Sequence, residues 1–155
     1  MEFRLHDKFD GFVALSYMWG LQKPLMLLST NLAELEEEGG LSPFDPRIPR
    51  TIKDSMILCE RLGEDYLWVD SLCIMQKTPE ASDQIKRMDS IYQSAKFTIV
   101  AAYGTDSEAG LPGVKPGSRV LEQRMADVRG LKLANVLPQF TYTVDNSLWN
   151  TRGWT

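Results

Sequence analysis

The stretch that decides the fold is Tyr66–Gln76, YLWVDSLCIMQ, an apolar run that nevertheless contains an aspartate. Residues 66–70 are predicted to form a buried strand, which places Asp70 at the carboxyl end of that strand. A carboxylate taken out of water needs polar partners. We therefore expect this end of the strand to open onto a polar pocket.

Two other segments have the same strand character. Residues 12–18, FVALSYM, are predicted as the first strand of the chain, and residues 97–102, FTIVAA, as the third. The third segment is almost entirely apolar, which is typical of a strand buried on both faces of a parallel sheet.

Helical patterns separate these strands. Leucines four and three residues apart indicate a helix over 31–38, which a glycine pair would end. A capping box of Thr51 and Asp54 is predicted to start a second helix that ends at Gly63. The apolar face of this second helix is expected to consist of Ile52, Met56, Cys59 and Leu62.

The third predicted helix begins at Pro79, with Thr78 as its N-cap. Residues 103–118 are rich in Gly, Pro, Ser and Asp and predict a long loop, whereas Phe140–Val144 alternates as a strand does. Arg152 is expected to pin the aromatic tail through a cation–π or ion-pair contact. The buried side of the third helix is expected to consist of Ile85, Met88, Ile91, Tyr92 and Ala95.

Helices that alternate with apolar strands favour a parallel sheet with right-handed crossover connections. The predicted fold class is therefore α/β, with a mostly parallel sheet flanked by helices and an irregular C-terminal part. At 155 residues, the chain is expected to form a single domain, 1–155.

The composition excludes several classes of function. The chain is 43% hydrophobic and 25% charged, and its net charge of −4 predicts no basic surface for nucleic acid. No apolar run approaches the roughly 20 residues of a membrane span, and the first residues have no leader pattern, so a cytoplasmic or nuclear location is expected. His6 is the sole histidine, so no metal site is predicted. Cys59 and Cys73 are expected to be buried, reduced thiols.

Polar and aromatic residues follow all three predicted strands. Ligands of open parallel sheets bind beyond the carboxyl ends of the strands, so these side chains are expected to share one pocket. They are Ser16, Tyr17 and Trp19 at the end of the first strand, Asp70 at the end of the second, and Tyr103, Asp106 and Glu108 after the third.

Each candidate also has a purely structural alternative. Asp70 could accept backbone N–H groups of the turn that follows it, and Glu80 could stabilise the first turn of a helix. Glu108 could be a solvated loop charge, and Gln76 could bond to loop backbone. The Ser16-Tyr17 pair could be a strand end packed beneath the neighbouring tryptophan.

Six blocks of the sequence resemble, in order and spacing, the fungal heterokaryon-incompatibility (HET) domain, and they span nearly the whole chain. The family's last block usually continues with an aromatic residue and Gln-Glu, whereas this chain stops at Thr155. We therefore expect a domain excised from a longer protein or a natural short form. The blocks are ALSYMWG at 14–20, PRTIKDSM at 49–56, YLWVDSLCIMQ at 66–76, QIKRMDSIYQSAKFTIVAAYG at 84–104, GLPGV at 110–114 and RGWT at 152–155.

This resemblance implies a cell-death trigger in fungal non-self recognition, acting with a nucleotide-binding receptor or another incompatibility protein. The HET family is similar to the TIR domains of innate immunity, which are flavodoxin-like and self-associate. Several TIR domains cleave NAD at the nicotinamide–ribose bond. By this similarity, NAD is the expected substrate and no further cofactor is required.

The TIR comparison also suggests roles for the candidate residues. The cleavage passes through an oxocarbenium-like transition state, which a carboxylate beside the ribose stabilises. TIR enzymes carry a glutamate just after the third strand, which corresponds here to Glu108 or to Asp106, while Asp70 and Glu80 are the competing carboxylates. The ligand-binding set is expected to be Ser16, Tyr17, Trp19, Gln76 and Tyr103.

Three functions remain open at the level of the sequence. The first is an NAD nucleosidase of TIR type. The second is a non-catalytic domain that oligomerises and transmits the death signal, which the Trp, Tyr and Met content supports because these residues are enriched at interfaces. The third is a nucleotide sensor that binds NAD without cleaving it.

Overall fold

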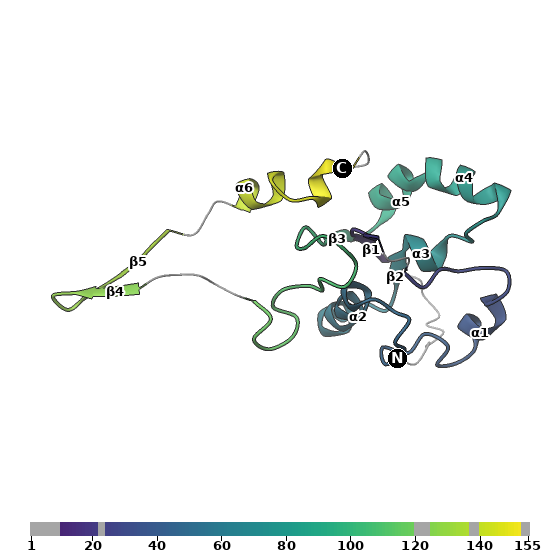
Figure 1. Cartoon of the computed structure of the whole chain (residues 1–155). Helices are drawn as coiled ribbons and strands as arrows, with labels where there is room; N and C mark the ends of the chain where they lie inside the picture. The colour runs from purple at the N-terminus through teal and green to yellow at the C-terminus, as the bar shows by residue number, and fades with distance from the viewer. Residues whose placement is uncertain (1–9, 22–23, 120–124, 137–139, 153–155) are drawn as a thin grey trace.

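The computed structural model has a three-stranded parallel sheet at its centre, formed by β1 (Val13–Ser16), β2 (Leu67–Val69) and β3 (Phe97–Val100) (Figure 1). The strand order is β2-β1-β3, with Val13 opposite both Leu67 and Phe97. This order is the one with which doubly wound, flavodoxin-like sheets begin. The predicted α/β class is therefore confirmed. The structure describes residues 10–21, 24–119, 125–136 and 140–152.

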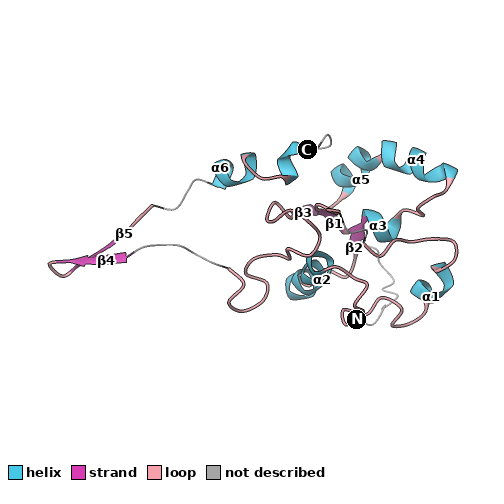
Figure 2. Ribbon diagram, in the orientation of Figure 1, coloured by secondary structure: helices cyan, strands magenta, loops and turns pink. Residues whose placement is uncertain are grey.

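Helices cover both faces of this sheet. α2 (Arg50–Leu62) packs on one face, and α4 (Pro79–Lys86) and α5 (Met88–Ser94) pack on the other (Figure 2). The connection from β1 to β2 and the connection from β2 back past β1 to β3 run in opposite directions. Because both crossovers are right-handed, their helices must lie on opposite faces. The short helices α1 (Leu32–Glu36) and α3 (Asp70–Cys73) complete this part of the chain.

The alternation of side chains along β1 builds the core. Val13, Leu15 and Tyr17 face α2, where they pack against Ile52 and Cys59 in the larger apolar cluster. Val13, Ala14 and Leu15 are fully buried, as expected for the central strand. Burying one such large apolar side chain contributes about 1.5–3 kcal/mol. On the other face, Trp68 of β2 meets Tyr92 of α5 edge to face, with ring centroids 5.6 Å apart.

β3 differs from its prediction as a strand buried on both faces. Within the described residues it pairs only with β1 and forms one edge of the sheet. Phe97 and Val100 are consequently exposed, at 39% and 42%. An apolar run is compatible with an edge strand as well as with a central one, so composition alone could not distinguish them.

The predicted start of α2 is wrong in its details. α2 begins at Arg50, after Pro49, and the capping box of Thr51 and Asp54 does not form. Both residues instead bind the loop that follows β3. The predicted end is confirmed, because Gly63 takes the left-handed conformation, with φ of +74°, that terminates helices.

The predicted third helix is divided in two. Arg87, with φ of −101° and ψ of 10°, separates α4 from α5. Pro79 is the first residue of α4 as predicted, but the hydroxyl of Thr78 donates to the carbonyl of Met75 instead of capping the helix. Ile85, predicted to be buried, is 37% exposed.

The C-terminal part contains the largest departure from expectation. Phe140–Val144, predicted as a strand, lies in helix α6 (Phe140–Asp145). A strand needs a neighbour for its backbone groups, whereas a helical turn satisfies them locally, as in the bond from Asn146 N to Tyr142 O. A short 3-10 helix, η1 (Trp149–Thr151), follows.

A β-hairpin that the sequence did not reveal extends away from the body (Figure 1). It consists of β4 (Met125–Val128) and β5 (Leu131–Ala134), which pair antiparallel. The two residues between them, Arg129 and Gly130, both have positive φ, as tight two-residue hairpin turns require.

The cysteines and the absence of a predicted membrane span can also be compared with the structure, whereas His6 and the end of the chain cannot. Cys59 is buried as predicted, but Cys73 is exposed. No helix in the described ranges is both long and apolar enough to span a membrane. His6 and residues 153–155 of the RGWT block lie outside the described residues.

Candidate functional site

Asp70 and the residues that follow β1 meet at the carboxyl edge of the sheet. The indole Nε1 of Trp19 donates to the two carboxylate oxygens of Asp70 at 3.2 and 3.1 Å. The backbone N–H of Ser71 donates to the same carboxylate at 2.7 Å, and the hydroxyl of Tyr17 donates to Ser71 Oγ at 3.0 Å. Asp70 is only 8% exposed, so a charged group is held here in a largely dry environment.

The surroundings perturb the protonation of this cluster. Burial raises the pKa of Asp70 above the usual range of an aspartate, although the donors Trp19 and Ser71 and the positive charge of Arg152 act in the opposite direction. Burial, reinforced by the charge of Asp70, also raises the pKa of Tyr17, which therefore stays a neutral hydrogen-bond donor. Perturbed groups of this kind are concentrated at functional sites.

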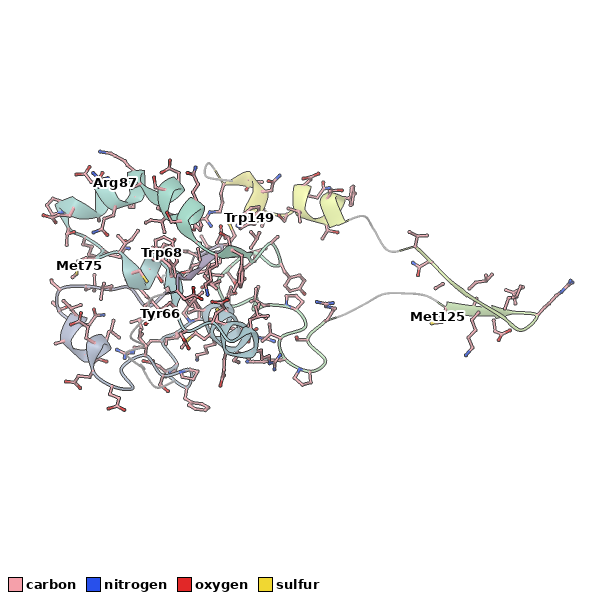
Figure 3. All side chains as sticks on the ribbon, turned by 180° about the vertical axis from the view of Figure 1, so that it is seen from behind. Tyr66, Trp68, Met75, Arg87, Met125 and Trp149 are labelled. Atoms are coloured by element: carbon pink, nitrogen blue, oxygen red, sulfur yellow. The ribbon has the colours of Figure 1, made fainter. Side chains whose placement is uncertain are left out.

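The C-terminal segment closes over the end of β1. The indole Nε1 of Trp149 donates to Ser16 Oγ at 2.9 Å, and the guanidinium of Arg152 donates to the backbone carbonyl of Tyr17. Figure 3 shows Trp149 at the body of the molecule, whereas Met125 lies far out on the hairpin. The expected pinning of the tail by Arg152 thus occurs through a backbone carbonyl.

The loop after β3 borders the same edge. Gly20 lies so close to this loop that a Cβ atom on it would be 2.3 Å from the Cβ of Asp106. The backbone N–H of Ser107 donates to the carbonyl of Trp19 at 3.4 Å. The structure therefore brings Ser16, Tyr17, Trp19 and Asp70 together and places Asp106 beside them.

The remaining predicted residues occupy separate positions, and Gln76 is the one of them that bonds to Asp70. Glu108 is exposed and turns toward α2, where its carboxylate accepts the N–H of Arg50 at 3.4 Å. Glu80 is exposed in the first turn of α4, and Tyr103 is 61% exposed. The side-chain amide of Gln76 donates to the backbone carbonyl of Asp70 at 3.2 Å, so it braces the main chain at Asp70.

Sequence reasoning missed several partners of the site. Ser71 and Tyr92 were not predicted as site residues, yet Ser71 accepts the Tyr17 hydroxyl and Tyr92 donates to the carbonyl of Leu15 at 3.3 Å. The contact between Trp149 and Ser16 was also missed. It joins residues 133 positions apart, and no local pattern signals it. Among the described residues, His, Cys, Asp and Glu side chains form no group that could hold a metal ion.

A separate, largely apolar cavity of about 410 Å³ opens between β2, α3 and the α4–α5 pair. Trp68, Cys73, Ile74 and Arg87 are among its lining residues. None of the sequence-predicted site residues lines it. The predicted site residues and this cavity are thus in different places.

Comparison with protein families gives one result. The model of the family described as heterokaryon incompatibility protein (HET) matches residues 12–155, a range that contains all six sequence blocks. Comparisons with curated proteins and with solved structures give no match.

Proposed function

Because this chain belongs to the heterokaryon incompatibility (HET) family, we propose that it is a cell-death-inducing signalling domain of fungal non-self recognition that cleaves NAD at the nicotinamide–ribose bond. One observation carries the enzymatic part of the proposal. The buried carboxylate of Asp70 lies beside Trp19 and Tyr17 at the edge where open α/β sheets bind their ligands.

The proposed reaction requires the ionised form of a carboxyl group, because the nicotinamide leaves without being protonated. The bond between ribose C1′ and the nicotinamide nitrogen breaks, and its electron pair neutralises the positively charged ring. The positive charge that develops on the ribose is stabilised by the ionised carboxylate of Asp70. Water adds to C1′ and loses a proton, so that the products are nicotinamide, ADP-ribose and a proton.

The neighbouring groups supply binding and orientation. The hydrogen bonds from Trp19 and Ser71 hold the carboxylate of Asp70 in one orientation. In this proposal the indole face of Trp19 stacks on a ring of the dinucleotide, with Ser16, Tyr17, Gln76 and Tyr103 as further contacts. Arg152 contributes a guanidinium near Asp70, and guanidinium groups suit the recognition of phosphate.

The test is release of nicotinamide from NAD by the purified domain, measured at several protein concentrations. We expect turnover by the wild type and a loss of at least about 100-fold in Asp70→Asn, as for removal of other transition-state-stabilising groups. Asp106→Asn, Glu108→Gln and Glu80→Gln are assayed beside it, so the largest loss identifies the catalytic carboxylate among the four candidates. Asp83→Asn, on the exposed side of α4, is the matched control.

Two outcomes contradict this assignment. Undiminished cleavage by Asp70→Asn would remove Asp70 from the reaction. Absence of turnover by the wild type at every concentration would remove the enzymatic proposal itself. Thermal stabilisation by NAD without release of nicotinamide would then select a nucleotide sensor.

A second candidate function is a non-catalytic domain that oligomerises and transmits the death signal. The β4–β5 hairpin favours it. Leu131 and Leu133 are 68% and 53% exposed on an element that extends away from the body of the chain. Such a domain would still trigger cell death after every carboxylate of the proposed site had been replaced by its amide, whereas an NAD-cleaving domain would not.

A further inference from the structure

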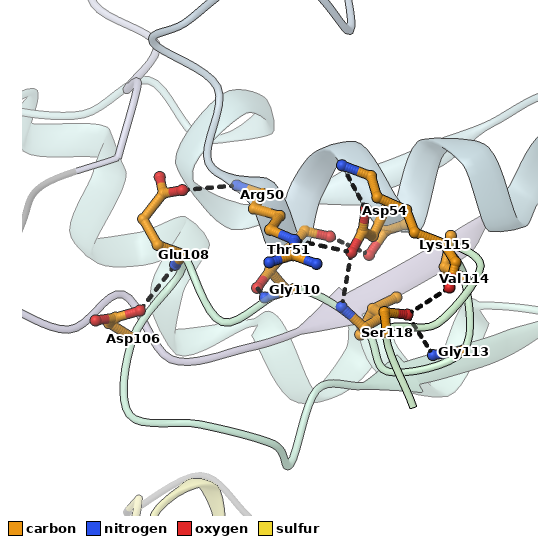
Figure 4. Close-up of polar contacts among 12 residues, drawn as sticks. Arg50, Thr51, Asp54, Asp106, Glu108, Gly110, Gly113, Val114, Lys115 and Ser118 are labelled. Carbon is orange, nitrogen blue, oxygen red and sulfur yellow. Dashed lines mark hydrogen bonds and ion pairs between the residues drawn. The ribbon is translucent and has the colours of Figure 1, made fainter. Parts of the chain in front are cut away.

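The first turn of α2 holds the loop that follows β3. The backbone N–H of Thr51 donates to the carbonyl of Ser107 at 2.9 Å. The hydroxyl oxygen of Thr51 accepts the N–H of Gly110 at 3.0 Å (Figure 4). The carboxylate of Asp54 accepts the N–H of Leu111 at 2.9 Å. Three hydrogen bonds from two buried residues therefore fix residues 107–111 against the helix.

Burial of the Asp54 carboxylate has a cost in free energy. Its side chain is fully buried, and its Oδ1 atom has no hydrogen-bond partner. Two longer ion pairs flank it, with Lys115 Nζ at 3.6 Å from Oδ1 and Arg50 Nε at 3.8 Å from Oδ2. Burying a carboxylate with so few direct bonds costs free energy.

The other side of the same loop touches the proposed ligand site. Asp106 packs against Gly20, and the N–H of Ser107 donates to the carbonyl of Trp19. The contact at Gly20 is too close to admit a Cβ atom, and so is the contact at Gly110, where a Cβ would lie 2.6 Å from Asp54 Oδ2. Both glycines have φ of +74°. The loop is therefore in close contact with α2 on one side and with the Trp19-Gly20 segment on the other.

We propose that Asp54 is a positioning residue of the site, because it holds the 105–111 loop and thereby keeps the indole of Trp19 on the carboxylate of Asp70. Without this support, the Trp19-Gly20 segment loses its packing surface and the indole N–H no longer points steadily at Asp70. The effect on catalysis rests on the proposed NAD cleavage. The structural part concerns only the contact between Trp19 and Asp70.

The experiment follows the indole N–H of Trp19 by NMR in the ¹⁵N-labelled domain while pH is varied. The group that it reports on is Asp70, which is faced by Trp19 and Tyr17 after β1, by Tyr92 of α5, by Cys73 of α3 and by Arg152 of the tail. In Asp54→Asn we expect the Trp19 resonance to shift and its pH midpoint to rise. The midpoint rises because the Trp19 donor lowers the pKa of Asp70, and a weaker donor lowers it less.

Matched variants make the result specific. Thr51→Val removes the acceptor for Gly110 and is expected to shift the Trp19 resonance and midpoint in the same direction, which keeps the test available should Asp54→Asn fail to fold. Ser55→Ala is the control, because Ser55 is equally buried in α2 but donates within the helix, to the carbonyl of Thr51. The control is expected to leave the Trp19 resonance and its midpoint in place.

Two results would overturn the positioning role. One is a folded Asp54→Asn or Thr51→Val domain with an unchanged Trp19 resonance and midpoint. The other is an equal change in Ser55→Ala, which would mean that any damage to α2 has this effect. If the wild type cleaves NAD, cleavage should fall about ten- to a hundredfold in Asp54→Asn. If it does not, the NMR result is unaffected, so the two proposals fail separately.

Discussion

At the scale of single residues, Asp70 illustrates a conflict between stability and the proposed chemistry. The folded chain buries this carboxyl, and burial raises its pKa in spite of the donors Trp19 and Ser71. Such a residue weakens the fold when it is ionised. However, an ionised carboxylate that is already held in a fixed orientation is what stabilisation of a positively charged transition state requires.

This conflict predicts how Asp70→Asn changes stability with pH. Because the pKa of Asp70 is higher in the folded chain than in the unfolded chain, the folded state holds the proton more tightly. The favourable contribution of Asp70 is therefore complete below the ordinary aspartate pKa of about 4 and is lost as pH rises through the folded-state pKa. We expect Asp70→Asn to gain stability over the wild type as pH rises from about 3 to 7.

Urea unfolding of both proteins across this pH range measures the effect. Each pH unit between the folded and unfolded pKa values corresponds to about 1.4 kcal/mol. Asp83→Asn, a change of an exposed carboxylate, serves as the control. Parallel stability curves for the wild type and Asp70→Asn would contradict the expectation, and so would a wild type that gains stability relative to the variant.

Burial has a different consequence for Cys59 than for Asp70. It lies in the larger apolar cluster beneath the sheet, and burial, with a smaller effect from the charge of Glu64, raises the pKa of its thiol to about 11. The thiolate is therefore scarce near neutral pH. Cys59 is therefore a packing residue and not a candidate nucleophile.

At the scale of elements, the hairpin has two unlike faces. Cross-strand pairing places Ala126 opposite Leu133 and Val128 opposite Leu131, which makes one face apolar. The other face includes the pair of Asp127 and Lys132. A two-stranded hairpin is marginally stable alone in water, so an exposed apolar face on it favours association with another surface.

We predict that this face mediates self-association of the domain. The double variant Leu131→Lys, Leu133→Lys places charges on the apolar face and is expected to abolish concentration-dependent association, measured by sedimentation velocity. Lys132→Ser, on the opposite face, should associate as the wild type does. A wild type that stays monomeric over the whole concentration range would refute the prediction, as would a double variant that still associates.

At the scale of the whole molecule, stability is distributed unevenly. β1 lies between two strands and two helical layers, whereas the hairpin is exposed along both of its strands. Backbone amides in buried, densely packed elements exchange with solvent only through large openings, but those of exposed elements exchange through local ones.

Hydrogen exchange should reveal this gradient. At dilute, monomeric concentrations, we expect the amides of 13–16 to be among the slowest to exchange and those of 125–134 among the fastest. The comparison is read residue by residue by NMR or by mass spectrometry. Strong protection of the hairpin in the dilute domain would show that it packs against the body of the same chain.

The departures from prediction have a common physical origin. The pattern of residues 140–144 suits a strand, but these residues pair with no described strand and form the helix α6 instead. Thr51 and Asp54 have the spacing of a capping box, yet the loop after β3 supplies other donors for both. In each case a distant or missing partner decided between two locally acceptable structures.

The sequence by itself determined the parallel α/β class, the three central strands, the glycine that ends α2 and the placing of Asp70, Tyr17 and Trp19 at one edge. These depend on periodicity and on chain direction, which are local properties. Only the tertiary structure decided that β3 is an edge, that Trp149 and Arg152 close over β1 and that Asp54 grips a loop 57 residues away. These contacts join segments far apart in the chain, and their free energy depends on how the elements pack and not on any pattern within one of them.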